Sequence, residues 1–279
     1  MSRIRFKSWY LICLLPMLLA FSPAVNERSI ELPEPCSTTN EVFSAGEEIV
    51  YKIYYNWNFV WLSAGEVTFR VYDEGDEYHI SAKGRTYDSY EWFFKVRDNY
   101  DSYIDKETLL PRLHIRDVNE GSYERYDKVE FDQTARTAVS KRGRNRDDAT
   151  PESFDLNDCM HDILSSVYYM RNVDVSEISP GDKLPVKIFF DRKVYPLNVK
   201  YHGNENKTRV KGMGNFRTYR FSPDLIAGEV FKEGDEMNVY ISADQNKIPV
   251  LIESPVSVGS VKVVLKSYKG LRYDFTAKN

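Results

Sequence analysis

The sequence predicts a mainly β protein built from antiparallel meanders, which form a curved sheet, a half-open barrel or two packed sheets. Three observations support this fold class. Tyrosine and phenylalanine are abundant, with 20 and 15 residues in a chain of 279, and both favour strands. Apolar and polar residues alternate with a period of two, whereas only one segment has helical spacing. Two parts of the chain also repeat a similar pattern.

The N-terminal residues have the layout of a secretory signal peptide. Residues 3–7 carry three positive charges and residues 9–21 form an apolar run. The small residues Ser22 and Ala24 fit a cut before residue 25. The apolar run is short for a membrane span, so we expect residues 1–24 to be removed, with an uncleaved anchor as the alternative.

The charge of the chain argues against two classes of partner. The formal net charge is −4, and loss of the three positive charges in residues 3–7 would bring it to −7. A moderately acidic protein has no electrostatic footprint for nucleic acid or for an anionic membrane surface. After cleavage we also expect no integral membrane segment.

Two cysteines, Cys36 and Cys159, remain after the signal peptide. An oxidising compartment would permit one bridge between them, and two buried thiols are the alternative. No His, Cys, Asp or Glu residues stand at the spacing of a metal site, and no cofactor motif occurs. We therefore expect neither a metal nor a cofactor.

The first β unit is expected at residues 46–150, after an exposed polar arm at residues 25–45. Apolar and aromatic residues occupy every odd-numbered position from Ile49 to Trp57, and the even-numbered positions hold Lys52 and Asn56 together with Val50 and Tyr54. This period of two predicts a strand with one buried face. A turn is expected at residues 62–65, followed by a second strand, so that the pair forms a hairpin.

A connecting helix is expected within residues 151–175. Leu156, Met160 and further apolar residues recur there at helical spacing. Ser153 or Asp155 is expected to be its N-cap. The helix should cover an open side of the sheet.

The second β unit, residues 176–279, resembles the first. The segment "GEEIVYKIYY" at 46–55 matches "GDKLPVKIFF" at 181–190 in character, and "YIDKETLLPRL" at 103–113 resembles "YISADQNKIPVLI" at 240–252. Two matches in the same order predict an internal duplication. General strand–turn–strand patterning is the alternative.

Aromatic residues are densest at the tip of the first hairpin. Trp57, Phe59 and Trp61 have no aromatic-rich counterpart in the second unit, so they are the candidate ligand-binding residues. Ile49 and Tyr51 are more simply explained as core.

Catalytic motifs are missing from the sequence. There is no nucleophile elbow and no phosphate-binding glycine loop. The dipeptide His161-Asp162 is more typical of a helix surface than of a metal site. Asp98 and Asp101 are the acids that a hydrolase would use, provided that they meet in one cleft. Arg85, Arg97 and Arg171 are candidates to pair an anionic group, but nothing distinguishes them from surface arginines.

The same segments carry a resemblance to a known family. The matching pieces are "GEEIVYKIYYNWNFVWLSAGEVTFRV", "YIDKETLLPRLHI", "CMHDILSSVYYMR" and "VYISADQNKIPVLIESPVSVGSVKVVL". They resemble the bacterial domain-of-unknown-function 3108 (DUF3108) family in order along the mature chain. The resemblance implies an exported, β-rich envelope protein and supplies no catalytic residue.

Three hypotheses of function follow. The first is a non-catalytic protein of the periplasm or outer envelope of a Gram-negative bacterium. It would bind a lipid, a glycan or an envelope protein through a concave aromatic face. The second is a carboxylate-based hydrolase of an envelope polymer, and the third is a structural or assembly factor.

Overall fold

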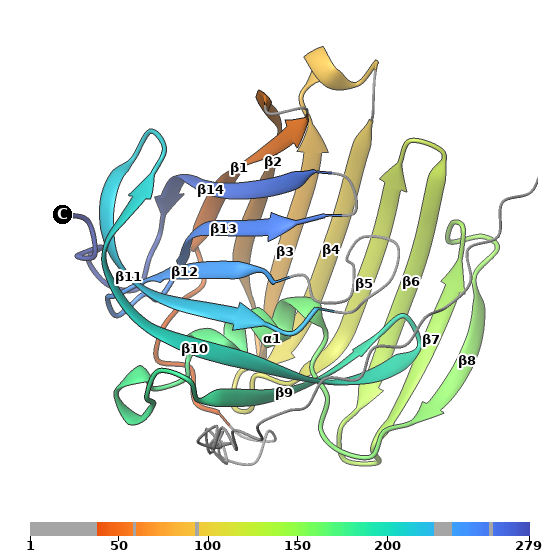
Figure 1. The fold of residues 1–279 in the computed structure, drawn as a ribbon. Coiled ribbons are helices and arrows are strands. Elements are labelled where there is room, and N and C mark those ends of the chain that lie inside the picture. Colours follow the sequence, from red (N-terminus) through yellow and green to blue (C-terminus); the bar gives the residue numbers. More distant parts are fainter. Residues whose placement is uncertain (1–37, 58–59, 93–94, 226–235, 257–258) are drawn as a thin grey trace, which may run out of the picture.

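A computed structural model describes residues 38–57, 60–92, 95–225, 236–256 and 259–279, which Figure 1 draws as a ribbon. Within these ranges the chain folds into fourteen strands, one α-helix and two short 3-10 helices. The predicted mainly β fold class is therefore confirmed. None of the helices in the described ranges has the length and hydrophobicity of a membrane span.

The first eight strands form an up-and-down meander in which each strand pairs antiparallel with the next. The 3-10 helix η1 (Asp88–Tyr90) lies between the third and fourth of them. The strands are β1 (Glu48–Trp57), β2 (Val60–Glu74), β3 (Glu77–Thr86), β4 (Val96–Asp105), β5 (Pro111–Glu120), β6 (Tyr123–Asp132), β7 (Thr137–Gly143) and β8 (Thr150–Asp155).

Six further strands form a second meander. They are β9 (Lys183–Phe190), β10 (Lys193–Val210), β11 (Gly214–Pro223), β12 (Asn238–Ser242), β13 (Pro249–Pro255) and β14 (Ser260–Lys269). β14 pairs with β1, so both meanders belong to one antiparallel sheet with β8 and β9 at its edges. The sheet curves strongly without closing into a barrel (Figure 1).

The first hairpin forms as predicted, but its turn does not lie at residues 62–65. β1 ends at Trp57 and β2 begins at Val60, so residues 62–65 lie inside β2, next to a bulge in its pairing with β1. Glycine is required at position 65 because β2 and β3 approach closely there, and not because the chain turns. A Cβ at this position would lie 2.3 Å from the carbonyl oxygen of Arg85.

The helix α1 (Ile163–Arg171) begins later than predicted. Ser153 and Asp155 belong to strand β8, so neither is the N-cap. The cap is Asp162, whose carboxylate accepts two backbone hydrogen bonds from the first helical turn, at 2.7 and 3.0 Å. The 3-10 helix η2 (Val175–Glu177) follows α1.

The two meanders repeat the same backbone bonds at their first strands. Gly46 N donates to the carbonyl of Val71 and Val71 N donates to that of Glu47, at 2.9 and 3.0 Å. In the second meander, Gly181 N donates to the carbonyl of Tyr201 at 2.8 Å, and Tyr201 N donates to the carbonyl of Asp182 at 2.9 Å. Both glycines have positive φ, 93° and 103°. The internal duplication itself stays a prediction.

The main core lies between α1 and the inner face of β2–β4. Leu164 and Tyr168 of the helix pack there on Val71, Ile80 and Ile104. Because these side chains fill this part of the concave face, it is a packed core and not an open binding surface. Ile49 and Tyr51 of β1 are also buried, as expected, in a second cluster with β13 and β14.

The turn between β9 and β10 joins the two ends of the sheet. Asp191 and Arg192 both have positive φ there, at 55° and 62°. Arg192 donates to the backbone carbonyls of Ser140 and Thr150, at 3.2 and 2.9 Å. Asp191 accepts a bond of 2.9 Å from Arg142. Side-chain contacts thus bring β9–β10 against β7–β8 although no strand ladder connects them.

Candidate functional site

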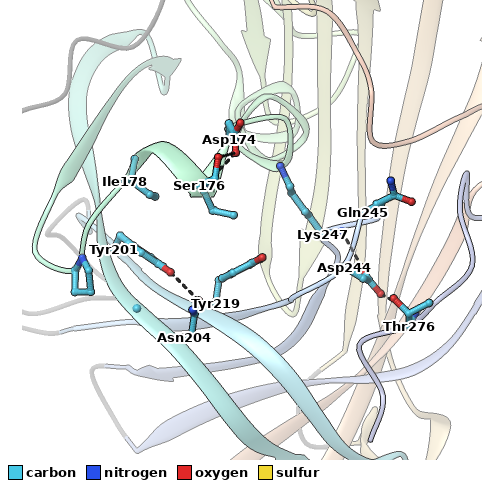
Figure 2. A pocket seen from close by; sticks show the side chains of 13 residues that line it. Asp174, Ser176, Ile178, Tyr201, Asn204, Tyr219, Asp244, Gln245, Lys247 and Thr276 are labelled. Atoms are coloured by element: carbon cyan, nitrogen blue, oxygen red, sulfur yellow. Dashed lines mark hydrogen bonds between the residues drawn. The ribbon is translucent and has the colours of Figure 1, made fainter.

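A hollow of about 720 Å³ lies beside η2. It lies between the segment that follows α1, the strands β10 and β11, and the turn before β13 (Figure 2). Its lining residues are Asp174, Val175, Ser176, Ile178, Pro180, Tyr201, Gly203, Asn204, Tyr219, Asp244, Gln245, Lys247 and Thr276. We call this hollow the η2 groove.

Two tyrosines form the aromatic wall of the η2 groove. Tyr201 of β10 and Tyr219 of β11 come from paired strands, and their ring centroids lie 6.4 Å apart at 62°. Figure 2 shows both side chains beside Ser176 and Ile178 of the η2 segment. Their proximity depends on the β10–β11 register, which has a shift at Gly203. Tyr201 and Tyr219 are 18 residues apart in the sequence, and no local motif predicts that they meet.

The two carboxylates of the η2 groove are occupied by structural bonds. Asp174 Oδ1 accepts from the backbone and hydroxyl of Ser176, at 2.9 and 2.8 Å. Asp244 accepts five bonds from the groups Ser242 Oγ, Asn246 N, Lys247 N, Thr276 N and Ala277 N. Asp244 therefore holds its turn and also fixes the C-terminal segment.

Hydrogen-bond donors remain available in the same groove. Lys247 Nζ donates to the carbonyl of Val173 at 2.7 Å, and burial lowers the pKa of this ammonium. Asn204 Oδ1 accepts from the hydroxyl of Tyr201 at 2.9 Å, which leaves the Asn204 amide N–H groups unpaired among the described residues. The Gln245 side chain is exposed and makes no hydrogen bond within the described ranges. Two aromatic rings and three donor groups thus surround one hollow.

The predicted aromatic tip of the first hairpin is only partly described. Phe59 lies outside the described residues, and Trp57 is placed only as the last residue of β1. Trp61 is 37% exposed, and the Lys262 ammonium lies 4.8 Å from the centre of its ring. No contact in the described residues joins Trp61 to the η2 groove.

The predicted cysteine pair is also partly described. Cys159 is buried shortly before the helix, and Cys36 lies outside the described residues. The bridge between them stays a prediction. No group of three or more metal-binding side chains is found in the described part of the chain.

Asp98 and Asp101 do not meet in one cleft. They stand three residues apart on β4, so their side chains point to opposite faces of the sheet. Asp101 Oδ1 lies 2.8 Å from Nε2 of His79 on the outer face. Asp98 approaches Glu120 instead, and burial together with that second carboxylate raises the pKa of Asp98 to about 7. The Asp98–Asp101 cleft required by the hydrolase hypothesis is absent.

His161 and Asp162 are not on the helix surface, contrary to expectation. His161 is 1% exposed and its backbone bonds to β9, at Lys187 and Phe189. Asp162 Oδ2 accepts a 2.5 Å bond from Ser102 Oγ. His114 Nδ1 lies 3.5 Å from Asp162 Oδ1. These contacts dock the capped helix end on β4 and β5 in a fully buried site.

The three candidate arginines have different environments. Arg171 is buried and pairs with Glu47, so it is a structural residue. Arg97 pairs with Glu91, and its Nη1 donates to the carbonyl of Val96 at 2.7 Å. Arg85 is exposed and makes no ion pair with a described residue.

Comparison with solved structures supports the fold alone. A crystal structure of a "beta-barrel-like protein" of the domain of unknown function DUF1849 from Brucella abortus matches with a TM-score of 0.54 at 10% identity. The match covers 84% of this chain and 100% of that one. A protein with a YmcC-like fold from Bacteroides fragilis NCTC 9343 gives a TM-score of 0.29 at 9% identity, over the same shares. No curated protein matches the chain.

The sequence itself matches one family model. This model, described as "Protein of unknown function (DUF3108)", covers residues 50–266. The matched range includes every strand from β2 to β13, the helix α1 and most of the lining of the η2 groove. The resemblance predicted from the strand segments is confirmed, and the chain belongs to the DUF3108 family.

Proposed function

We propose that the protein is a non-catalytic binding protein and that its ligand occupies the η2 groove. The observation that carries this proposal is that one hollow is lined both by two tyrosine rings, Tyr201 and Tyr219, and by amide donors without a described partner. A few polar groups in a partly aromatic concave site are typical of small-molecule binding sites. A binding role fits better than catalysis because the carboxylates of Asp174 and Asp244 already accept hydrogen bonds that hold the local structure.

The chemistry of the lining favours an amphipathic ligand that is rich in oxygen acceptors, such as a glycan. The half-buried Tyr219 ring, backed by the buried Tyr201, would offer an apolar face to the C–H side of a sugar ring, while the Asn204 and Gln245 amides would donate to its oxygens. The Lys247 ammonium adds a cation, which favours an acidic sugar over a neutral one. The groove volume of about 720 Å³ is within the range of ligand pockets.

Titration calorimetry with two soluble probes tests this proposal. The probes are a galacturonate trisaccharide, which is acidic, and an N-acetylglucosamine trisaccharide, which is neutral. We expect Tyr219→Ala to weaken binding at least tenfold, about 1.4 kcal/mol, because it removes the ring on which the sugar would stack. Gln245→Ala, at an exposed position, should weaken it a few-fold without affecting folding.

The matched control is Tyr72→Ala on β2, because Tyr72 is an exposed tyrosine (41%) outside the groove. It should bind as the unaltered protein does. A glycan site in the η2 groove would be contradicted if the protein bound neither trisaccharide. It would also be contradicted if the Tyr72 and Tyr219 variants lost binding affinity equally.

Export belongs to the same proposal and rests on the leader-like residues 1–24, which lie outside the described residues. A binding protein of the periplasm or outer envelope would meet glycans there. N-terminal sequencing of the protein from a Gram-negative host should find a chain that begins at residue 25. A full-length chain in the cytoplasmic fraction would contradict export.

A further inference from the structure

A second hollow lies over β2–β4, apart from the η2 groove. It measures about 370 Å³, and its lining residues are Glu66, Thr68, Arg70, Lys83, Gly84, Arg85, Arg97, Asp98 and Asn99. Most of these positions alternate with the core residues of the same strands, so their side chains stand on the outer face of the sheet. We call this hollow the outer groove.

The outer groove holds four cationic side chains, two of which have acidic partners. Arg70 Nε lies 2.6 Å from Glu48 Oε2, and Arg97 pairs with Glu91. Lys83 and Arg85 are exposed and make no ion pair or hydrogen bond with any residue in the described ranges. The groove therefore has two cationic side chains without a carboxylate at ion-pair distance in the described ranges, although Glu66 and Asp101 lie near enough to feel their charge.

The sheet register makes this arrangement unfavourable without an anion. Arg85 of β3 stands directly opposite Arg97 of β4. Like charges at directly opposed positions destabilise a sheet pair. On the other side Arg85 faces Glu66 of β2, but Glu66 also contacts Lys266 and accepts a bond of 2.7 Å from the hydroxyl of Tyr87. Glu48 and Glu91 are taken by Arg70 and Arg97, and Glu66 is shared with Lys266, so no described carboxylate forms an ion pair with Arg85.

The neutral groups of the outer groove are suited to an oxyanion. Thr68 lies opposite Lys83 on one side, and Asn99 lies opposite it on the other. A hydroxyl and an amide can both donate to an anionic oxygen. Two guanidinium groups bind oxyanions through paired N–H donors, and the lysine adds a point charge. The lining thus offers a grid of donors across three adjacent strands.

We propose that the outer groove binds a phosphorylated ligand with at least two negative charges, held by Lys83, Arg85 and Arg97. The ligand neutralises the Arg85–Arg97 repulsion and accepts bonds from Thr68 and Asn99. A soluble phosphorylated molecule and a phospholipid headgroup present the same chemistry. The local positive charge stands out on a chain whose formal net charge is −4.

The test uses the double variant Lys83→Gln/Arg85→Gln and two probes. One probe is inorganic pyrophosphate, followed by calorimetry. The other is vesicles of phosphatidylglycerol, followed by co-sedimentation. We expect at least tenfold weaker binding of the effective probe by the variant, and weaker binding by the unaltered protein at higher salt. Pyrophosphate binding assigns a soluble ligand, whereas vesicle binding alone assigns a lipid headgroup.

The matched control is Lys207→Gln/Arg209→Gln on β10. These residues have the same types and spacing and are also exposed, but Arg209 lies opposite Asn215 instead of an arginine. The control should bind the probe unchanged. Thermal unfolding checks that weaker binding does not come from a damaged fold. Lys83→Gln/Arg85→Gln should melt at the same or a higher temperature than the unaltered protein, since the repulsion between Arg85 and Arg97 is removed. Binding of neither probe, or equal losses in both double variants, would overturn the proposal.

Discussion

Arg171 and Glu47 form a two-point ion pair in the interior of the protein. Arg171 Nη1 lies 2.7 Å from Glu47 Oε1, and Nη2 lies 2.8 Å from Oε2, with side chains 2% and 0% exposed. Arg171 Nη2 also donates to the carbonyl of Asn246 at 3.0 Å. The pair therefore links the last turn of α1, the residue before β1 and the turn before β13.

Loss of one partner of this pair should destabilise the fold strongly. Glu47→Gln leaves a buried guanidinium without its counter-charge, and such losses cost about 3–5 kcal/mol. Urea unfolding measures the change. Glu47→Leu combined with Arg171→Met should cost less than the sum of the single changes, because the pair is removed together. The matched control is Asp182→Asn, at the equivalent residue after Gly181, where one hydrogen bond of 2.7 Å is affected. A control as damaging as Glu47→Gln would refute the ion-pair explanation.

Arg192 should be the residue that holds the two ends of the sheet together. Arg192 uses three nitrogens: Nη2 donates to one carbonyl each of β7 and β8, Nε donates to Ser140 Oγ and Nη1 to Glu152. The single nitrogen of Arg192→Lys cannot replace all of these bonds, so we expect a loss of about 1–2 kcal/mol in unfolding free energy. Amide hydrogen exchange should accelerate in β8. Arg144→Lys is the control, since Arg144 is 72% exposed and pairs only with Glu124. If β8 exchange is unchanged, the turn does not hold this edge.

Burial of His161 should make the protein less stable in mild acid. Desolvation lowers the pKa of His161 to about 4, against about 6.5 in an unfolded chain. The unfolded state then binds more protons between these values, so stability falls as the pH drops from 6.5 to 4. In His161→Phe the unfolding free energy should fall less steeply as the pH drops, with a slope smaller by up to about 1.4 kcal/mol per pH unit. Parallel stability curves for the two proteins would count against this origin.

Asp98 should have the opposite effect on stability over nearly the same pH range as His161. Its pKa is raised to about 7, so the folded state holds a proton that the unfolded state has lost above about pH 4. The contribution of Asp98 to stability should therefore fall as the pH rises from 4 to 7, against the rise that His161 contributes, so each effect is measured as the difference between the variant and the unaltered protein. Asp98→Asn should exceed the unaltered protein by about 1 kcal/mol at pH 8, allowing for partial solvent screening, and match it at pH 4.

Asp101 provides the control for this pH effect. Burial raises the pKa of Asp101, but hydrogen bonds from His79 and Ser81 outweigh it and leave the pKa below the usual value. Asp101→Asn should therefore destabilise the protein at pH 8. A gain in stability in both variants at pH 8 would show that the effect is one of net charge alone.

The strand pattern was predictable from the sequence because it depends on local alternation. Ile49 and Tyr51 are buried at a period of two, as predicted. The helix start was less predictable. β8 is an edge strand whose side chains are mostly exposed, so its polar residues resemble the start of a helix. Gly65 likewise resembles a turn residue, although it serves a close approach between strands.

The candidate sites were not predictable, because pairing between distant residues creates them. Tyr201 and Tyr219 meet through the β10–β11 register, and Arg85 faces Arg97 through that of β3 and β4. The sequence named Arg85 and Arg97 as candidates without a reason to prefer them. Trp61, selected for aromatic density, lies under the Lys262 ammonium rather than in a described hollow.

The location of the bound glycan tests the proposed function most directly. An ¹⁵N-labelled protein should be titrated with the galacturonate trisaccharide while backbone and amide side-chain signals are followed by NMR. The proposal predicts shifts confined to the η2 groove, above all at Asn204, Gln245 and the backbone of η2. Shifts centred on Trp61 at the hairpin tip, or no shifts at all, would contradict it.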